Sequence, residues 1–144
     1  VRVLEERPDI ALVYADLWIT ATENETFAKF TPVGKFTWQD FDPRTLVEGC
    51  YIGPQPMWRK ALHAKYGYFD ESFESAGDWE FWLRIAEHEN FLHLNEFLGL
   101  YLQSSSSIEH RDPGLSIQET RRVQRRYAWR RSAGQALGAD TARM

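Results

Sequence analysis

The sequence contains one cysteine, Cys50, among its 144 residues. A single thiol excludes an internal disulfide framework and argues against a zinc site built from several cysteines. No stretch approaches the roughly 20 apolar residues that a membrane-spanning helix needs, so no transmembrane segment is predicted. These absences are compatible with a reducing setting, and we expect a cytoplasmic protein or one at the periphery of a membrane.

Several motifs of well-understood chemistry are also absent. Neither GxGxxG nor GxxxxGK[ST] occurs, which excludes the standard phosphate-binding loops. The four histidines have no metal-binding spacing such as HExxH. His110, in a polar loop, is the one histidine we consider able to reach a metal or phosphate, and a solvated loop histidine is the alternative. The serines at 104–107 have no glycine elbow, so a serine nucleophile is not predicted.

Aromatic residues are abundant instead, with six Trp, six Tyr and nine Phe. The hydrophobic and charged fractions, 43% and 26%, are those of a folded globular protein and exclude a wholly disordered chain. The length suits one domain. The first residues, VRVLEERPDI, contain no initiating Met and do not follow the plan of a signal peptide, so we expect a segment of a longer protein.

Charge is distributed unevenly along the chain. Residues 1–120 carry 10 basic and 20 acidic side chains, a net −10, whereas residues 121–144 carry 7 and 1, a net +6. The basic excess comes from a run of arginines on the predicted last helix, at 121, 122, 125, 126, 130 and 131. These arginines could form a solvated or docking surface, bind an anionic membrane, or pair with the acidic side chains of residues 1–120. The net negative charge of residues 1–120 argues against nucleic acid as a partner, because it would repel the phosphates.

Hydrophobic patterning predicts an α/β chain. The continuous apolar run Ile10–Ala15, closed by Asp16, is typical of a strand covered on both faces. Further strands are predicted at 56–58, 91–94 and 97–102, with a loop and a short strand within 22–42. Helices are predicted at 1–6, 42–49, 60–66, 78–89 and 116–131. No linker is long enough to divide the chain.

Asp78 is the first candidate for chemistry because it begins the clearest predicted helix. There it could act as the N-cap residue, or as a general base held in fixed orientation at the mouth of a cleft. Helical spacing places Trp82 on the side of Asp78 and points Trp79 away. Trp82, with Trp58 and Tyr51, could form a wall on which sugar rings stack, or could belong to the core. Glu80 and Arg84 have the favourable i,i+4 spacing.

Three stretches together resemble the C-terminal, acceptor-side half of a family 2 glycosyltransferase, an inverting class with the GT-A fold. They are, in chain order, PDIALVYAD, MWRKALHAKYGYFDE and AGDWEFWLRIAEHENFLHLNEFLGLYLQSSSSIEH, and they cover about residues 8–110. The resemblance implies a partial GT-A mixed sheet flanked by helices, followed by a C-terminal amphipathic helix. We therefore expect 1–115 to be the C-terminal part of a glycosyltransferase domain and 116–144 to be a basic helix and tail.

The resemblance also implies roles for individual residues. Asp78 corresponds to the aspartate that takes the proton from the acceptor hydroxyl, as general base, when a sugar moves from a nucleotide sugar with inversion. Asp70 and Glu71 correspond to the FDE turn that shapes the acceptor side. Glu80 and Arg84 correspond to the structural positions of the helix after that turn.

The chain departs from the family pattern in three places. The nucleotide-binding half, with its Asp-x-Asp metal motif, lies outside this sequence. Gly77 stands where the family often has Glu, and Leu102-Gln103-Ser104 follow Tyr101 where it often has Arg-x-His. The resemblance thus implies Mn²⁺ or Mg²⁺ in the full-length enzyme and no metal in this chain.

These departures define the activity and partners expected of the chain alone. Its activity should be slight or absent, because the residues that would bind the donor and the metal are missing. The partners expected in the parent enzyme are a nucleotide sugar, a hydroxyl acceptor and the missing N-terminal half. Self-association through the exposed edge of a truncated sheet is expected as well. The alternative is a non-catalytic carbohydrate- or protein-binding module that uses the same aromatic cleft.

Overall fold

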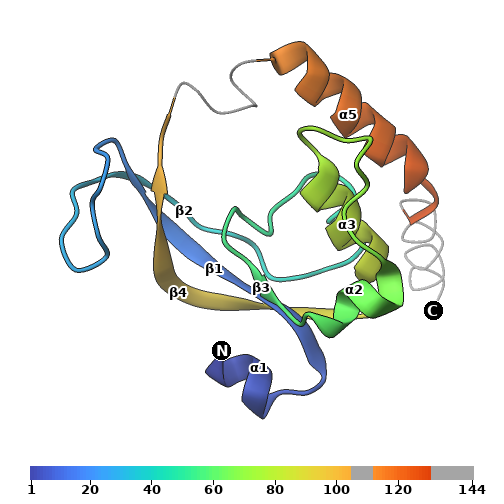
Figure 1. The fold of residues 1–144 in the computed structure, drawn as a ribbon, viewed down its shortest axis with the longest axis horizontal. Helices are drawn as coiled ribbons and strands as arrows, with labels where there is room; N and C mark the ends of the chain where they lie inside the picture. The colour runs from blue at the N-terminus through green and yellow to red at the C-terminus, as the bar shows by residue number, and fades with distance from the viewer. Residues whose placement is uncertain (105–111, 131–144) are drawn as a thin grey trace, which may run out of the picture.

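The computed structural model describes residues 1–104 and 112–130. Its four strands form one sheet with helices on both faces (Figure 1). The elements in chain order are α1 (Arg2–Glu6), β1 (Ile10–Thr20), β2 (Pro32–Phe36), β3 (Met57–Trp58), α2 (Ala61–Tyr66), α3 (Gly77–Ile85), β4 (Asn90–Leu102) and α5 (Pro113–Arg126).

β1 is the central strand and pairs with each of the others. β4 runs parallel to it along its whole length, from the Ile10–Asn90 pair to the Thr20–Leu102 pair. β2 and β3 are antiparallel to β1 and pair with its C-terminal and N-terminal parts, respectively. The expected α/β class, with a mixed sheet flanked by helices, is confirmed.

The prediction that β1 ends at Asp16 is wrong, because the strand continues to Thr20. Asp16 is only 3% exposed, yet its carboxylate accepts a hydrogen bond from the Trp38 N–H at 2.9 Å and lies 2.8 Å from His93 Nε2. A buried charge is tolerated in a strand when it is paired and hydrogen-bonded. These partners lie 22 and 77 residues away along the chain.

β1 contributes to two hydrophobic clusters, and a register shift between Ile10 and Leu12 interrupts its strict alternation. Ile10 and Val13 pack with Leu4 of α1 on one face. Leu12 and Tyr14 belong to a larger cluster on the other face, together with the buried side of α3. Figure 1 accordingly shows α1 on one side of the sheet and α3 on the other.

The predicted helix at 42–49 is wrong, because residues 43–48 form a series of turns. Asp42 begins the first turn as expected of a capping residue, with its carboxylate accepting the Arg44 N–H at 2.8 Å. The Asp42 carbonyl, however, also accepts the Tyr51 hydroxyl at 2.7 Å. A helix this short is marginal on its own, so such tertiary contacts decide its form.

Two other helices are confirmed with shifted ends. α3 stops at Ile85 rather than Glu89, and residues 86–88 form a turn before β4 begins at Asn90. α5 starts at Pro113 rather than Ser116, because the Asp112 side chain accepts the Leu115 N–H at 2.9 Å as its N-cap.

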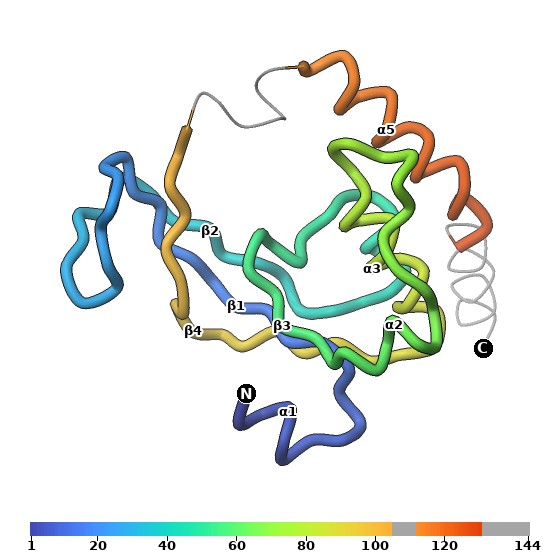
Figure 2. Tube along the Cα trace, in the orientation of Figure 1, coloured from blue at the N-terminus to red at the C-terminus, as the bar shows by residue number. Residues whose placement is uncertain are grey.

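α5 packs on the same core as the sheet. Val123 and Tyr127 are buried in the cluster that contains Leu12 and Tyr14, and Figure 2 shows the helix running beside the segment that carries α3. The boundary expected after residue 115 therefore falls inside α5. Within residues 1–104 and 112–130, no helix has the length and apolarity needed to cross a membrane.

Candidate functional site

A cavity of about 520 Å³ opens beside the N-terminus of α3. Residues from β2, the 48–54 loop, α3, the end of β4 and α5 line it, so its shape depends on the whole fold. Its lining combines aromatic rings, carboxylates and hydroxyls. The lining residues are Phe36, Trp38, Glu48, Gly49, Cys50, Gly53, Pro54, Glu74, Ser75, Ala76, Asp78, Trp79, Tyr101, Ser116 and Thr120.

Three rings in contact form one aromatic wall of the cavity. Phe36 stacks on Trp38 with a centroid distance of 5.0 Å, and Tyr101 meets the edge of Phe36 at 5.5 Å. Trp79 also lines the cavity, although it is 5% exposed and its Nε1 donates to the Leu46 carbonyl at 2.8 Å.

Trp38 is held in place from two sides. Asp16 accepts its backbone N–H, and Asp16 is in turn bonded to the buried side chain of His93. Gly53 lies against its indole with φ of +77°, a conformation that L side chains rarely adopt, and a Cβ there would come within 2.9 Å of Trp38 Nε1. The aromatic wall thus rests on a buried polar pair and on a glycine.

Asp78 is an exposed carboxylate on the cavity lining. The expectation that it is the N-cap is wrong: α3 starts at Gly77, Ala76 occupies the capping position, and Asp78 is the second helical residue. Its Oδ1 accepts the Trp79 N–H at 2.7 Å. In the first turn of α3 its negative charge is favoured by the helix dipole. A carboxylate so placed can accept a hydrogen bond, and then a proton, from a hydroxyl in the cavity.

Glu119 of α5 fixes the loop that precedes α3. Its carboxylate accepts the backbone N–H groups of Glu74, Ser75 and Ala76 at 2.7 to 2.8 Å, and it is only 5% exposed. Burial would raise the pKa of Glu119, but these hydrogen bonds outweigh it and hold the pKa below its ordinary value. Ser116 and Thr120 line the cavity from the same helix.

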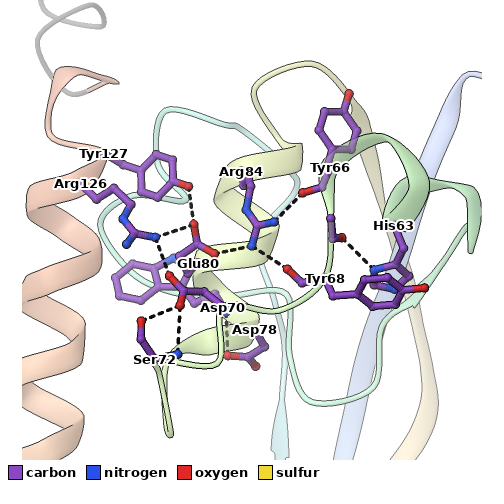
Figure 3. A network of polar contacts seen from close by, with 12 residues as sticks. His63, Tyr66, Tyr68, Asp70, Ser72, Asp78, Glu80, Arg84, Arg126 and Tyr127 are labelled. Atoms are coloured by element: carbon purple, nitrogen blue, oxygen red, sulfur yellow. Dashed lines mark hydrogen bonds and ion pairs between the residues drawn. The ribbon is translucent and has the colours of Figure 1, made fainter.

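The buried carboxylate of Glu80 joins α3 to α5 through an ionic cluster (Figure 3). Its carboxylate accepts Arg84 Nη2 at 2.7 Å, Arg126 Nη1 at 3.0 Å and the Tyr127 hydroxyl at 2.8 Å. Burial favours the neutral acid, but these donors outweigh it and lower the pKa of Glu80. The predicted i,i+4 ion pair between Glu80 and Arg84 is confirmed. Arg126, one of the arginines of the last helix, pairs with acidic side chains of residues 1–120, as one of the alternatives expected.

Asp70 and Glu71, expected on the acceptor side, do not line the cavity. Asp70 is bonded to Ser72, with its Oδ1 accepting that residue's N–H at 3.0 Å, and it pairs with Arg126 at 3.2 Å. The hydrogen bonds from Ser72 are the main reason that the pKa of Asp70 is lowered to about 2. Glu71 is exposed on the same turn. Asp70 therefore helps to hold the turn against α5.

Trp82, Trp58 and Tyr51, which were expected to form a sugar-facing wall, do not line the cavity. Trp82 is 2% exposed and packs edge to face with Trp58 at 5.0 Å. Tyr51 is buried, and its hydroxyl is bonded to the Asp42 carbonyl. Helical spacing cannot show that Trp58 of β3 and Phe69 pack against Trp82.

Sequence reasoning missed the residues that do form the wall and the acidic rim. Trp38 and Phe36 lie in a stretch of weak periodicity, Tyr101 ends an ordinary apolar run, and Glu48 and Glu74 resemble common surface carboxylates. The one available signal is the aromatic excess itself. It cannot say which rings share a surface, because that depends on which segments the sheet brings together.

In the part of the chain that the structure describes, no group of three or more His, Cys, Asp or Glu side chains could hold a metal ion. His110, the candidate for contact with a metal or phosphate, lies outside the described residues. A comparison of the chain with family models and with curated proteins finds no match.

Proposed function

We propose that this chain is the acceptor-side part of an inverting glycosyltransferase with the GT-A fold, and that Asp78 is its general base. The observation that carries the proposal is the position of Asp78: an exposed carboxylate on a cavity that also presents an aromatic wall. The resemblance of residues 8–110 to family 2 glycosyltransferases assigns the same aspartate to the same task.

The composition of the cavity suits a sugar or another polyhydroxylated acceptor. The C–H face of a sugar ring can pack on the stacked rings of Phe36 and Trp38 or on Tyr101 beside them, since aromatic faces attract such weakly positive hydrogens. Glu48 and Glu74, both exposed on the rim, can accept hydrogen bonds from hydroxyl groups. Together these groups could hold one hydroxyl against Asp78.

In the proposed reaction, the acceptor hydroxyl transfers its proton to the Asp78 carboxylate as its oxygen attacks the anomeric carbon of a nucleotide sugar. A new C–O bond forms on the face opposite the leaving group. The bond from the anomeric carbon to the nucleoside diphosphate breaks, and its electron pair leaves with the phosphate oxygen. Inversion results from this single displacement. A positioned general base of this kind contributes about 10²- to 10⁴-fold to rate.

The Mn²⁺ or Mg²⁺ implied by the resemblance is not matched by the described residues, which contain no cluster of three or more metal-binding side chains. We therefore assign no step of the reaction to a metal on this chain. The contribution proposed for this chain is acceptor binding and proton removal, with the nucleotide sugar held by an N-terminal half.

The alternative, a carbohydrate-binding module without catalysis, is favoured by one observation: the aromatic wall and acidic rim are complete within the described residues. A transfer assay separates the two functions. The proposed parent enzyme is mixed with nucleotide sugars and a panel of sugar acceptors, and release of nucleoside diphosphate is measured. Release with an anomerically inverted product supports the enzyme. Acceptor binding without any release supports the module.

A further inference from the structure

A second groove, of about 420 Å³, lies on the opposite side of α5 from the residues that line the cavity. Its walls are the turn at Ser72 and the α5 residues Leu115, Gln118, Glu119, Arg121, Arg122 and Arg125. Ser116 and Thr120 of the same helix line the cavity instead. The groove is therefore distinct from the proposed acceptor site.

The arginines of α5 differ in how they are neutralised. Arg126 pairs with both Asp70 and Glu80. Arg121 and Arg125 are exposed, and their side chains make no hydrogen bond or ion pair with any residue of 1–104 or 112–130. They stand four residues apart, so they project from one face of the helix, where two like charges repel and destabilise it. This arrangement leaves two uncompensated guanidinium groups on one groove.

The third guanidinium of the groove is held in a fixed position. Arg122 donates to the Ser72 carbonyl at 3.0 Å and to the Ser72 hydroxyl at 2.6 Å, and its guanidinium lies 4.1 Å from the centroid of the Phe73 ring. The carboxylate of Glu119 is the single acidic group of the lining, and it is turned to the backbone N–H groups of residues 74–76. The lining thus has a net charge of +2.

From this arrangement we propose that the groove between α5 and the Ser72 turn binds a phosphate-bearing anion through Arg121 and Arg125. The planar fork of a guanidinium matches the oxygens of a phosphate, with two parallel N–H donors to each group. The groove has ample room, since a phosphate replaces only a few waters of about 30 Å³ each. The same chemistry suits a soluble phosphate ester and the headgroup of an anionic lipid.

The test measures binding by the whole chain of two probes: pyrophosphate in solution, and phosphatidylcholine vesicles with and without phosphatidic acid. The double variant Arg121→Gln/Arg125→Gln is compared with Arg2→Gln/Lys60→Gln, which removes the same charge from exposed positions on α1 and at the start of α2. Circular dichroism establishes that both variants are folded.

We expect the α5 variant to lose about tenfold or more in affinity, while the control stays within about twofold of the wild type. Pyrophosphate binding lost in the α5 variant shows that the groove takes a soluble phosphate anion, and vesicle binding lost in that variant shows that it takes a lipid headgroup. Asp78→Asn should bind the probes as the wild type does, which separates this site from the proposed function. Equal binding by the two double variants, or no binding of either probe by the wild type, would overturn the proposal.

Discussion

Glu119 connects α5 to the loop before α3 with a single carboxylate. Replacing it by alanine removes the acceptor of three backbone N–H groups at once. A hydrogen bond to a charged group is worth about 1.5–3 kcal/mol, and a buried donor without a partner costs about 1–3 kcal/mol. We therefore expect Glu119→Ala to lower the free energy of unfolding by about 3 kcal/mol or more, measured by urea denaturation.

The matched control for this change is Gln118→Ala, on the preceding residue of the same helix. Gln118 is exposed, so its loss should change the free energy of unfolding by less than about 0.5 kcal/mol. Equal effects from the two substitutions would mean that the Glu119 carboxylate does not anchor the loop.

Gly53 and Gly49 both line the cavity but differ in the surroundings that an added methyl would meet. At Gly53 the φ of +77° and the close approach of Trp38 both oppose a side chain, whereas at Gly49 nothing lies within 4 Å. Left-handed backbone costs an L residue about 1–2 kcal/mol, before any clash. We expect Gly53→Ala to destabilise the fold by at least that amount and to change tryptophan fluorescence, and Gly49→Ala to do neither. Unchanged stability in Gly53→Ala would contradict the described contact with Trp38.

At the scale of elements, local patterning predicts the secondary structure best where a helix or strand depends on its own residues. The spacing of Glu80 and Arg84 predicts their ion pair, and the glycine at 67, with φ of +81°, marks the end of α2. Local patterning does not predict the secondary structure where contacts with residues distant in the sequence determine it. Asp16 continues a strand because His93 and Trp38 satisfy it.

The candidate site is predictable only in part for the same reason. Asp78 is identifiable because it lies at the start of a helix within a recognisable motif. Helical spacing places Trp82 on the side of Asp78 but cannot show that Trp82 packs against Trp58 and Phe69, which come from other segments. Trp38 carries no local signal at all. A cavity shared by five segments leaves little trace in the sequence of any one of them.

The carboxylates that connect α5 to the α3 region make the stability of the molecule depend on pH. The pKa values of Asp70, Glu80 and Glu119 are all lowered in the folded state, Asp70 to about 2 from an ordinary 3.8. The unfolded chain therefore binds more protons in acid, and the free energy of unfolding falls as the pH drops below about 5. The stabilisation is fully present at a pH above the pKa values that these carboxyl groups have in the unfolded chain. It is lost as the pH falls through the lower pKa values that they have in the folded state.

Glu119→Gln isolates one of these contributions. Glutamine resembles the protonated acid, so the wild type should be more stable than the variant at pH 7. The difference in urea midpoint should narrow steadily between about pH 5 and pH 3. A difference that stays constant over this range would show that ionisation of Glu119 does not stabilise the fold.

At the scale of the whole molecule, the sheet and α5 together bring aromatic rings and carboxylates from five segments around Asp78. We propose that the two sides of α5 face different ligands, with hydroxyl and aromatic groups on the cavity side and uncompensated arginines on the other. Self-association through the sheet edge stays a prediction. The buried cluster at Glu80 supports both surfaces, because it joins α5 to α3.

The rate of sugar transfer by the Asp78→Asn variant of the proposed parent enzyme decides whether Asp78 is the general base. The matched control is Glu96→Gln, an exposed carboxylate on β4 that does not line the cavity. We predict that kcat falls by about 10²-fold or more in Asp78→Asn while the acceptor KM changes little, because a general base acts in the transition state. A kcat in Asp78→Asn equal to that of the Glu96→Gln control would contradict the assignment of Asp78 as the base.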